Sequence, residues 1–432
     1  MLDSLTTNHY IIIFASTIII SYFFNSYSKK SGIPAVLMLI GLGVVIKLIT
    51  GSWNEKFDEL LKLLGTVGLI LIVLEAALDL KLLKEKIGVI LKSLLVSIVG
   101  LVGTSYLAAL FLTLVVPDFN LITGLLLTIP LSILSSAIIL PSIDSLEEKK
   151  REFMIYESTF SDIIGIISFY AVLNTVNSSS LANVLPETLR GLAFTIAISI
   201  AISYVLIYVF QHLKGHAKLF LLISVLLVLY ALGKMMHLSS LIIILFFGLV
   251  LNNYKLFFKG PLKEFILEER VEGILDDFRV VTVESAFVVR TFFFILFGWS
   301  IVFSDLLSFE VLRVGMVFLI LIYLIRSLVL FVFNGTFKLD KITPEVFLAP
   351  RGLITILLFY SIPNGILPEG QLGFVKGVLL FIILFSCLIM AWSLVGEKKK
   401  LALEEGATVL EDRSLEKEDI DASENEDELP LT

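Results

Sequence analysis

The chain has 432 residues, of which 57% are hydrophobic and 17% are charged, and its mean hydropathy is +0.97. This composition excludes a soluble globular protein of that length and indicates an all-α protein that crosses a membrane many times. The net charge of −7 is misleading, because the terminal stretch 404–428 accounts for the negative balance.

The sequence also argues against several functional classes. Cys387 is the only cysteine, so no disulfide can form within the chain, and the four histidines are scattered. The sequence contains no metal-ligand cluster, nucleophile–base pair or nucleotide-binding loop. We therefore expect no enzyme, no cofactor and no nucleic-acid partner. The apolar run from Tyr10 is interpreted as a first membrane span rather than a signal peptide.

Apolar stretches of about 17–25 residues, the length that a bilayer of about 30 Å requires, recur along the chain. We interpret them as about thirteen spans, at 9–27, 32–50, 61–80, 88–115, 121–143, 153–175, 187–211, 217–236, 239–254, 284–304, 309–335, 346–363 and 371–395.

Basic residues are concentrated in the odd-numbered connections between these spans, for example at 81–86, 149–151, 255–270 and 338–341. By the positive-inside rule, the N-terminus lies outside and the C-terminus lies in the cytoplasm. An even number of spans would break this alternation.

Spans 5 and 12 carry helix-breaking residues. Pro130 and Pro141 flank a serine cluster in span 5, and Pro350 and Gly352 flank Arg351 at the start of span 12. If span 7 links two repeats of six spans, the two interrupted spans occupy matching positions. Matched interruptions in two halves are the best sequence indication of a transporter's binding site.

Span 6 contains two carboxylates, Glu157 and Asp162, in the stretch 156–165. Each would cost about 2.5–3.5 kcal/mol at the centre of a membrane helix, so each needs a partner or a functional role. Five residues correspond to about 140° around a helix, so the two side chains face different neighbours. Ser158 shares a face with Asp162. The alternative for Glu157 is a solvated position near the membrane surface.

Beyond these two, few ionisable residues look buried within spans: Glu75 in span 3, Arg290 in span 10, Arg326 in span 11 and Arg351 in span 12. We expect a neutralising pair between Glu157 and Arg326, which leaves Asp162 as the spare acid. The alternative for Arg290 and Arg351 is an interfacial position from which each side chain reaches the headgroups.

Two hydrophilic regions complete the chain. Residues 262–277 are charged and roughly amphipathic, which is consistent with a helix on the cytoplasmic surface or with an ordinary loop helix. Residues 397–432 are acidic and lack an apolar face, so we expect a disordered cytoplasmic tail after a membrane domain at 1–396.

At these residues the chain resembles the monovalent cation/proton antiporters of the sodium/proton exchanger superfamily, and most closely the bacterial NhaP-type members. Glu157-Ser158 followed by Ser161-Asp162 resembles the family's Glu-Ser, spacer, Asn-Asp pattern. The other segments that carry the resemblance are Leu74 to Leu78, Arg326-Ser327, Pro350-Arg351-Gly352 and the phenylalanine-rich stretch after Arg290.

The resemblance implies that Asp162 binds the cation or the proton and that Glu157 pairs with Arg326. Na⁺ prefers oxygen ligands, for which Ser135, Ser136, Ser158 and Ser161 are candidates, while Glu75, Arg290 and Arg351 are accessory residues. The sequence departs from the family where span 5 often has Thr-Asp-Pro and this chain has Ser135-Ser136-Ala137. A serine before Asp162 is similar to the neutral residue of electroneutral members.

The implied protein is an antiporter with two inverted repeats, whose broken spans 5 and 12 cross. The core comprises spans 4–6 and 11–13, spans 1–3 and 7–9 are of the dimerisation type, and span 10 links them. We expect exchange of Na⁺, or Li⁺ or K⁺, for protons by a homodimer in a bacterial inner membrane. The alternatives are a transporter that couples protons to K⁺ or to an anion, and a non-transporting sensor with the same fold.

Overall fold

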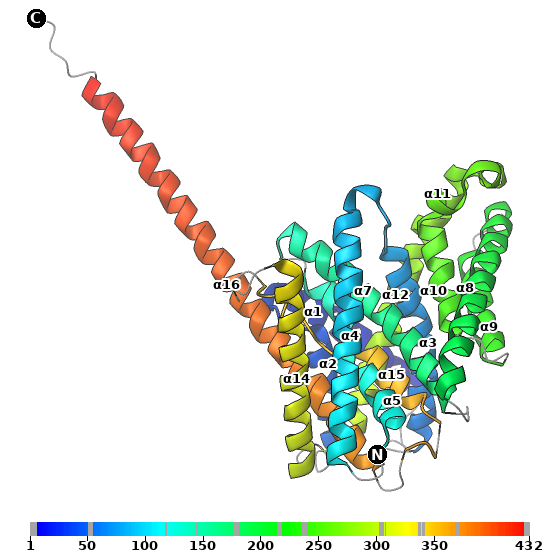
Figure 1. The fold of residues 1–432 in the computed structure, drawn as a ribbon. Helices are drawn as coiled ribbons and strands as arrows, with labels where there is room; N and C mark the ends of the chain where they lie inside the picture. Colours follow the sequence, from blue (N-terminus) through cyan, green and yellow to red (C-terminus); the bar gives the residue numbers. More distant parts are fainter. Residues whose placement is uncertain are drawn as a thin grey trace, which may run out of the picture.

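The computed structural model describes residues 7–50, 55–116, 119–143, 146–176, 181–213, 218–235, 240–301, 306, 308–335, 338, 342–363, 365–367 and 371–426. Figure 1 shows a bundle of helices from which the C-terminal helix projects. Residues 427–432 of the expected tail, and Lys214 and Lys341 of the expected charge pattern, lie outside the described residues.

The described residues of the first half form seven α-helices and two 3₁₀ turns. They are α1 (Thr7–Ser31), α2 (Ala35–Thr50), α3 (Glu55–Asp79), η2 (Lys84–Lys86), α4 (Ile87–Val115), α5 (Leu121–Ser132), α6 (Ser136–Ile139), η3 (Leu140–Ser142) and α7 (Glu148–Thr175).

The second half of the chain also consists mainly of long helices, and it includes the eight-residue helix α15. Its elements are α8 (Leu181–His212), α9 (Lys218–Met235), α10 (Ser240–Asn252), α11 (Tyr254–Phe257), η4 (Gly260–Phe265), α12 (Glu268–Ser300), α14 (Phe309–Asn334), α15 (Leu353–Tyr360) and α16 (Leu372–Glu426).

The all-helical membrane fold expected from the sequence is confirmed. Each of the thirteen expected spans coincides with a helical segment. Among the described residues, 7 helices are long and apolar enough to cross a membrane, and three shorter apolar helices accompany them. Large apolar side chains such as Val102, Leu114, Ile320 and Leu328 are exposed on α4 and α14, as a lipid-facing surface requires.

One hydrophilic region differs from expectation. Residues 262–277 do not form a separate surface helix, because α12 begins at Glu268 and continues without a break to Ser300.

The acidic stretch after residue 397 continues α16 to Glu426. It is rich in Leu, Ala, Glu and Lys, which are strong helix formers. Disorder of this tail in solution stays a prediction.

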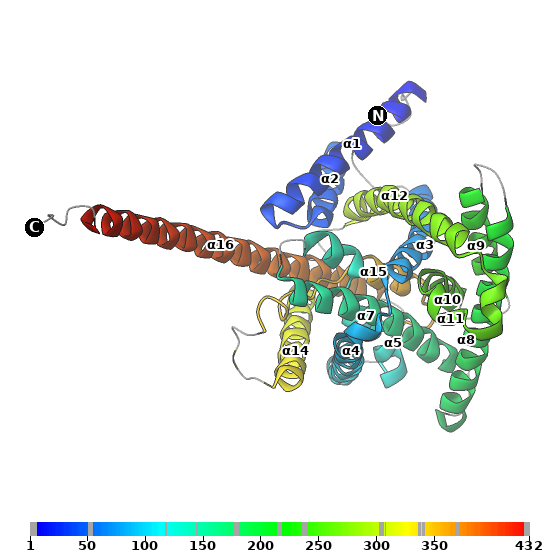
Figure 2. The same cartoon turned by 90° about the horizontal axis from the view of Figure 1, so that it is seen from above.

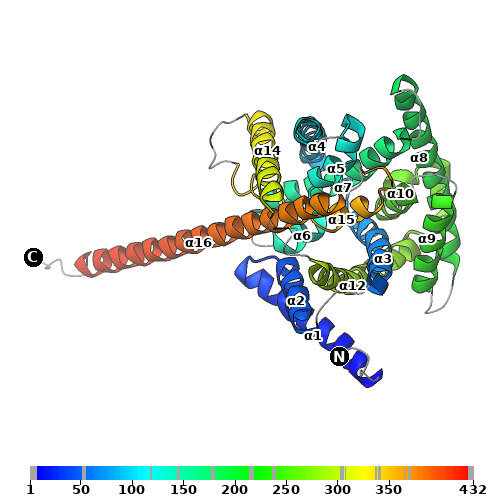
Figure 3. The same cartoon turned by 90° about the horizontal axis from the view of Figure 1, so that it is seen from below.

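The helices pack as two neighbouring groups. In one group, α4 packs against α5, α7 and α14, α14 packs against α16, and α15 packs against α5. In the other, α12 packs against α2 and α3, and α10 packs against α3, α8 and α9. Figure 2 shows α4 and α14 on the opposite side of the molecule from α9, and Figure 3 shows α15 near the centre.

The contact between α2 and α12 requires glycine in both helices. A Cβ atom at Gly43 would lie 2.1 Å from the Ile295 carbonyl oxygen, and one at Gly298 would lie 2.2 Å from the Ile40 carbonyl oxygen. These two positions therefore let the backbones approach closely, as small residues do in membrane helix pairs.

Several basic connections lie at one end of the bundle, to which η2 and α11 belong (Figure 1). The Lys398 ammonium donates to the Lys29 and Lys30 carbonyl oxygens, at 2.5 and 3.3 Å. The Lys150 ammonium donates to the Thr343 carbonyl oxygen at 2.6 Å, and Lys86 pairs with Glu152. Connections that are distant in the sequence thus meet at the same end.

Candidate functional site

The two interrupted spans meet at their breaks. The helix α5, which contains Pro130, ends at Ser132, and residues 133–135 separate it from α6. The other break precedes α15, and the Pro350 carbonyl oxygen there accepts a hydrogen bond from the Ser135 amide at 3.0 Å. The Thr355 hydroxyl donates to the Pro130 carbonyl oxygen at 2.8 Å. Each break therefore supplies partners for backbone groups that the other leaves open.

The crossing has no room for a side chain at Gly352. A Cβ atom there would lie 2.5 Å from the Ser135 hydroxyl oxygen. Two further breaks in the backbone hydrogen bonding are closed by serines: the Leu134 amide donates to Ser161 at 2.9 Å, and the Arg351 amide donates to Ser386 at 3.0 Å. The crossing is thus held by specific polar contacts rather than by helix continuity.

Asp162 of α7 lies at the first break and is 2% exposed. Its Oδ2 atom accepts hydrogen bonds from the Ser136 amide, at 3.3 Å, and from the Ser136 hydroxyl. Its Oδ1 atom is buried and has no hydrogen-bond partner among the described residues, and the same holds for the hydroxyl oxygen of the adjacent Ser135. Open oxygen atoms of this kind are potential ligands for a hard cation.

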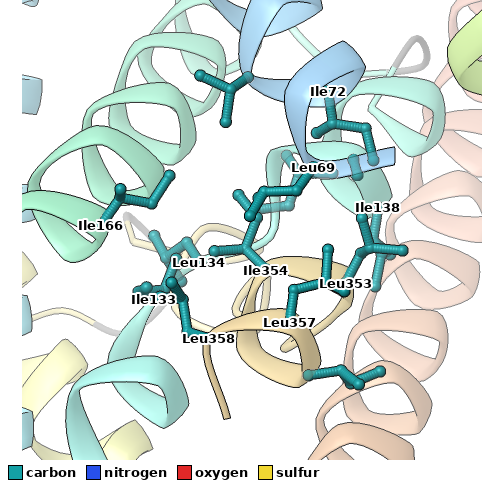
Figure 4. Packing of buried hydrophobic residues seen from close by; sticks show 14 of the residues in the cluster. Leu69, Ile72, Ile133, Leu134, Ile138, Ile166, Leu353, Ile354, Leu357 and Leu358 are labelled. Carbon is teal, nitrogen blue, oxygen red and sulfur yellow. The ribbon is translucent and has the colours of Figure 1, made fainter. Parts of the chain in front are cut away.

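The surroundings of Asp162 are otherwise apolar. A small cavity beside the carboxylate is lined by Val73 and Ala76 of α3, Leu241 and Leu245 of α10, and Ile354 of α15, among others. Figure 4 shows Leu134 of the first break and Ile354 of α15 pointing toward one another in this region. The carboxylate thus lies where α7 and the broken spans approach α3 and α10 of the other group.

Glu157 faces a different neighbour, as its spacing from Asp162 predicts. Its two carboxylate oxygens accept hydrogen bonds from Nη1 and Nη2 of Arg326, at 2.7 and 3.0 Å. Arg326 also donates from Nε and Nη2 to the Glu345 carbonyl oxygen, at 2.9 and 2.7 Å. Both side chains are buried, so the alternative of a solvated Glu157 is wrong.

Two residues that the sequence reasoning did not select extend this pair. Lys150 of α7 lies 3.6 Å from the Glu345 carboxylate, and Glu345 holds Arg326 through its carbonyl oxygen. Lys150 and Glu157 are two helical turns apart on one face of α7. A chain of successive contacts therefore runs from Lys150 through Glu345 and Arg326 to Glu157. In the sequence, the available indication of Glu345 was its position directly before an apolar span, five residues before Pro350.

Arg351 and Arg290 are directed into the protein rather than to its surface. Arg351 is 2% exposed, and its Nε and Nη1 atoms have no hydrogen-bond partner in the part of the chain that the structure describes. Arg290 of α12 donates to Glu75 of α3 at 3.3 Å, and both side chains are largely buried. This pair links α3 to α12.

The remaining candidates occupy different environments. The Ser158 hydroxyl donates to the Ile155 carbonyl oxygen of its own helix, at 3.3 Å, although helical spacing places it on the Asp162 face. The Ser161 oxygen accepts from Leu134. The structure thus brings Ser136 directly to Asp162 and places Ser135 beside it, without bringing Ser158 into contact.

This architecture, with a buried carboxylate at the crossing of two interrupted membrane helices, is that of a multi-pass membrane transporter. The family model for the sodium/hydrogen exchanger transmembrane region matches residues 13–395. The chain therefore belongs to the sodium/hydrogen exchanger family.

Solved structures agree on the fold. A structure of the sodium proton antiporter MjNhaP1 from Methanocaldococcus jannaschii at pH 8 is 20% identical, with a TM-score of 0.67, over 88% of this chain and 98% of that one. An EM map of MjNhaP1 gives 17% identity and a TM-score of 0.65, over 93% and 98% of the two chains. A search of curated proteins gave no significant match.

Proposed function

We propose that the protein is a secondary antiporter that exchanges a monovalent cation for protons, with Asp162 as the group that binds either one. The observation that carries the proposal is the carboxylate itself, buried at the crossing of the two breaks with Oδ1 unpartnered. Membership of the sodium/hydrogen exchanger family supports it.

The exchange follows from competition for one carboxylate. Protonated Asp162 has no charge with which to hold a cation, and a bound cation occupies the oxygen that the proton needs. We assign Ser135 and Ser136 as hydroxyl ligands beside Asp162, with Ser158 and Ser161 as further candidates after rearrangement. One carboxylate binds one proton or one monovalent cation, so the exchange is electroneutral.

Coupling requires that only an occupied site changes sides. Asp162 lies beside α3 and α10, at the boundary of the two helix groups, where a relative movement would change its access. We assign the group of α4 to α7 and α14 to α16 as the moving core, and α1 to α3 and α8 to α10 as the dimerising part, linked by α12. Glu75, Arg290 and Arg351 are accessory residues in this scheme.

The orientation of the protein in the membrane is also part of this proposal. The basic end of the bundle faces the cytoplasm, which puts the N-terminus outside and α16 inside, in a bacterial inner membrane. The expected cation is Na⁺, with Li⁺ and K⁺ as the other candidates.

The test is proton flux in proteoliposomes with an imposed pH gradient. Na⁺, Li⁺ and K⁺ are added in turn to vesicles that contain the wild type or Asp162→Asn. The matched control is Glu310→Gln, the same change of acid to amide at an exposed position of α14. We expect dissipation by Na⁺ in the wild type and the control, and none in Asp162→Asn. Flux that persists in Asp162→Asn, or no response of the wild type to any cation, would refute the proposal.

A further inference from the structure

A second cavity, on the Glu157 side of α7, contains a guanidinium without a counter-charge. It is lined by Thr104 of α4, Glu157 and Ser161 of α7, Arg326 of α14, and Arg351, among others. Its free space is about 20 Å³. A site of about 10–15 Å³ on this measure admits a water molecule, so the cavity can hold one monatomic ion or water.

The charges around this cavity do not balance. Both oxygens of the Glu157 carboxylate are occupied by Arg326, at 2.7 and 3.0 Å. Within the described residues, Nε and Nη1 of Arg351 have no partner, although the side chain is 2% exposed. Arg326 neutralises Glu157, so the positive charge of Arg351 is left over. Buried charges are normally paired, because an isolated one is costly in a medium of low dielectric constant.

The polar lining offers hydrogen-bond donors. The Ser161 oxygen accepts from the Leu134 amide, at 2.9 Å, so its own proton is available to the cavity. Thr104 adds a second hydroxyl, which is also buried. Together with Nε and Nη1 of Arg351, these groups favour an acceptor with negative charge, whereas a cation would be repelled by Arg351.

We propose that this cavity binds a small monatomic anion, such as chloride, as the resident counter-ion of Arg351. The cavity's size excludes a polyatomic anion such as gluconate, and its excess of one positive charge matches one monovalent anion. The anion is a fixed part of the structure and not cargo. The inference stands independently of the proposed cation exchange, because it rests on the other face of α7.

The test is thermal unfolding of the purified full-length protein in sodium chloride, sodium bromide or sodium gluconate of equal concentration. Constant sodium removes any effect of cation binding. A ligand that binds only the folded protein raises Tm in proportion to the logarithm of its concentration above Kd. We expect chloride and bromide to raise Tm by about 3 °C or more over gluconate, and we expect this difference to grow with the logarithm of the halide concentration.

Variants assign the effect to this cavity. Arg351→Gln removes the charge and should make Tm the same in chloride and gluconate, while Arg351→Lys should keep part of the difference. The matched control is Arg313→Gln, at an exposed position of α14, which should behave as the wild type.

If Arg351→Gln does not fold, a structure of the wild type soaked in bromide decides the question through anomalous density at Arg351. Equal Tm values in chloride and gluconate for the wild type would overturn the proposal. A halide effect that survives in folded Arg351→Gln, or bromide density absent from the cavity, would do the same.

Discussion

Glu157 and Asp162 lie five residues apart on α7 and are equally well buried. They differ in that Glu157 has an ion-pair partner, whereas Asp162 has none among the described residues. Glu157 has both oxygens occupied by Arg326, which the Glu345 carbonyl oxygen also holds. In the described part of the chain, Asp162 has only Ser136 as a donor and keeps Oδ1 open. The comparison teaches that a membrane carboxylate serves stability when its charge is neutralised, and is available for chemistry when it is not.

The largest effect is expected from removing the open carboxylate. Asp162→Asn keeps the shape of the side chain and eliminates its charge, so cation-driven proton flux should fall to the level of vesicles without protein. The Tm should not fall, because no ion pair is lost. A Tm that collapses together with the flux would show that Asp162, like Glu157, has a structural role.

Removing Arg326, the partner of Glu157, should lower the stability of the folded protein. Arg326→Ala leaves Glu157 buried without a counter-charge, and we expect the free energy of unfolding to fall by about 3–5 kcal/mol. Denaturant unfolding measures this, with Arg313→Ala at an exposed site of the same helix as the control. Glu157→Gln combined with Arg326→Gln should recover part of the loss. A normal stability of Arg326→Ala would contradict the comparison.

A smaller effect is expected at Ser136, which is the only side chain that donates to Asp162 among the described residues. Ser136→Ala removes a hydrogen bond that stabilises the charged carboxylate, so the KM for the cation should rise about tenfold. The control is Ser142→Ala, whose hydroxyl donates only to the Ile138 carbonyl oxygen. An unchanged KM in Ser136→Ala would remove Ser136 from the cation site.

The smallest effect is expected at Lys150, which contacts the Glu345 carboxylate. Lys150 is 25% exposed, so its interaction with Glu345 is partly screened by water. Lys150→Ala should lower the free energy of unfolding by less than about 1 kcal/mol, well below the loss in Arg326→Ala. Lys149→Ala, its exposed neighbour, is the control and should be neutral. A loss as large as that of Arg326→Ala would mean that Lys150 and Arg326 stabilise the protein as one unit.

The sequence predicts the spans, and it predicts that Glu157 and Asp162 face different neighbours, because both follow from simple periodicities. Apolar length defines a span, and five residues rotate Glu157 away from Asp162. Sequence reasoning predicts a span at 284–304 and a separate helix within 262–277, and it does not predict that one helix, α12, runs from Glu268 to Ser300. It places Ser158 on the Asp162 face, but it does not predict that the Ser158 hydroxyl donates to the Ile155 carbonyl oxygen. The role of Ser158 as a ligand stays a prediction.

Residues brought together by tertiary structure are harder to infer. Arg326 donates to the backbone carbonyl oxygen of Glu345. Every residue type has such an oxygen, so the sequence cannot indicate this contact. The start of α15 at Leu353, rather than at residue 346, depends on the crossing with the first break, which Pro350 and Gly352 indicate only approximately.

The mutual hydrogen bonding of the two breaks has a consequence for biogenesis. The Ser135 amide donates to the Pro350 carbonyl oxygen, and the Pro130 carbonyl oxygen accepts from the Thr355 hydroxyl, so each partner is translated more than two hundred positions later. An N-terminal fragment that enters the bilayer alone would carry these groups unsatisfied in hydrocarbon. The two halves are therefore expected to mature as obligate complements, so that separately expressed fragments become stable only when both are synthesised in the same membrane.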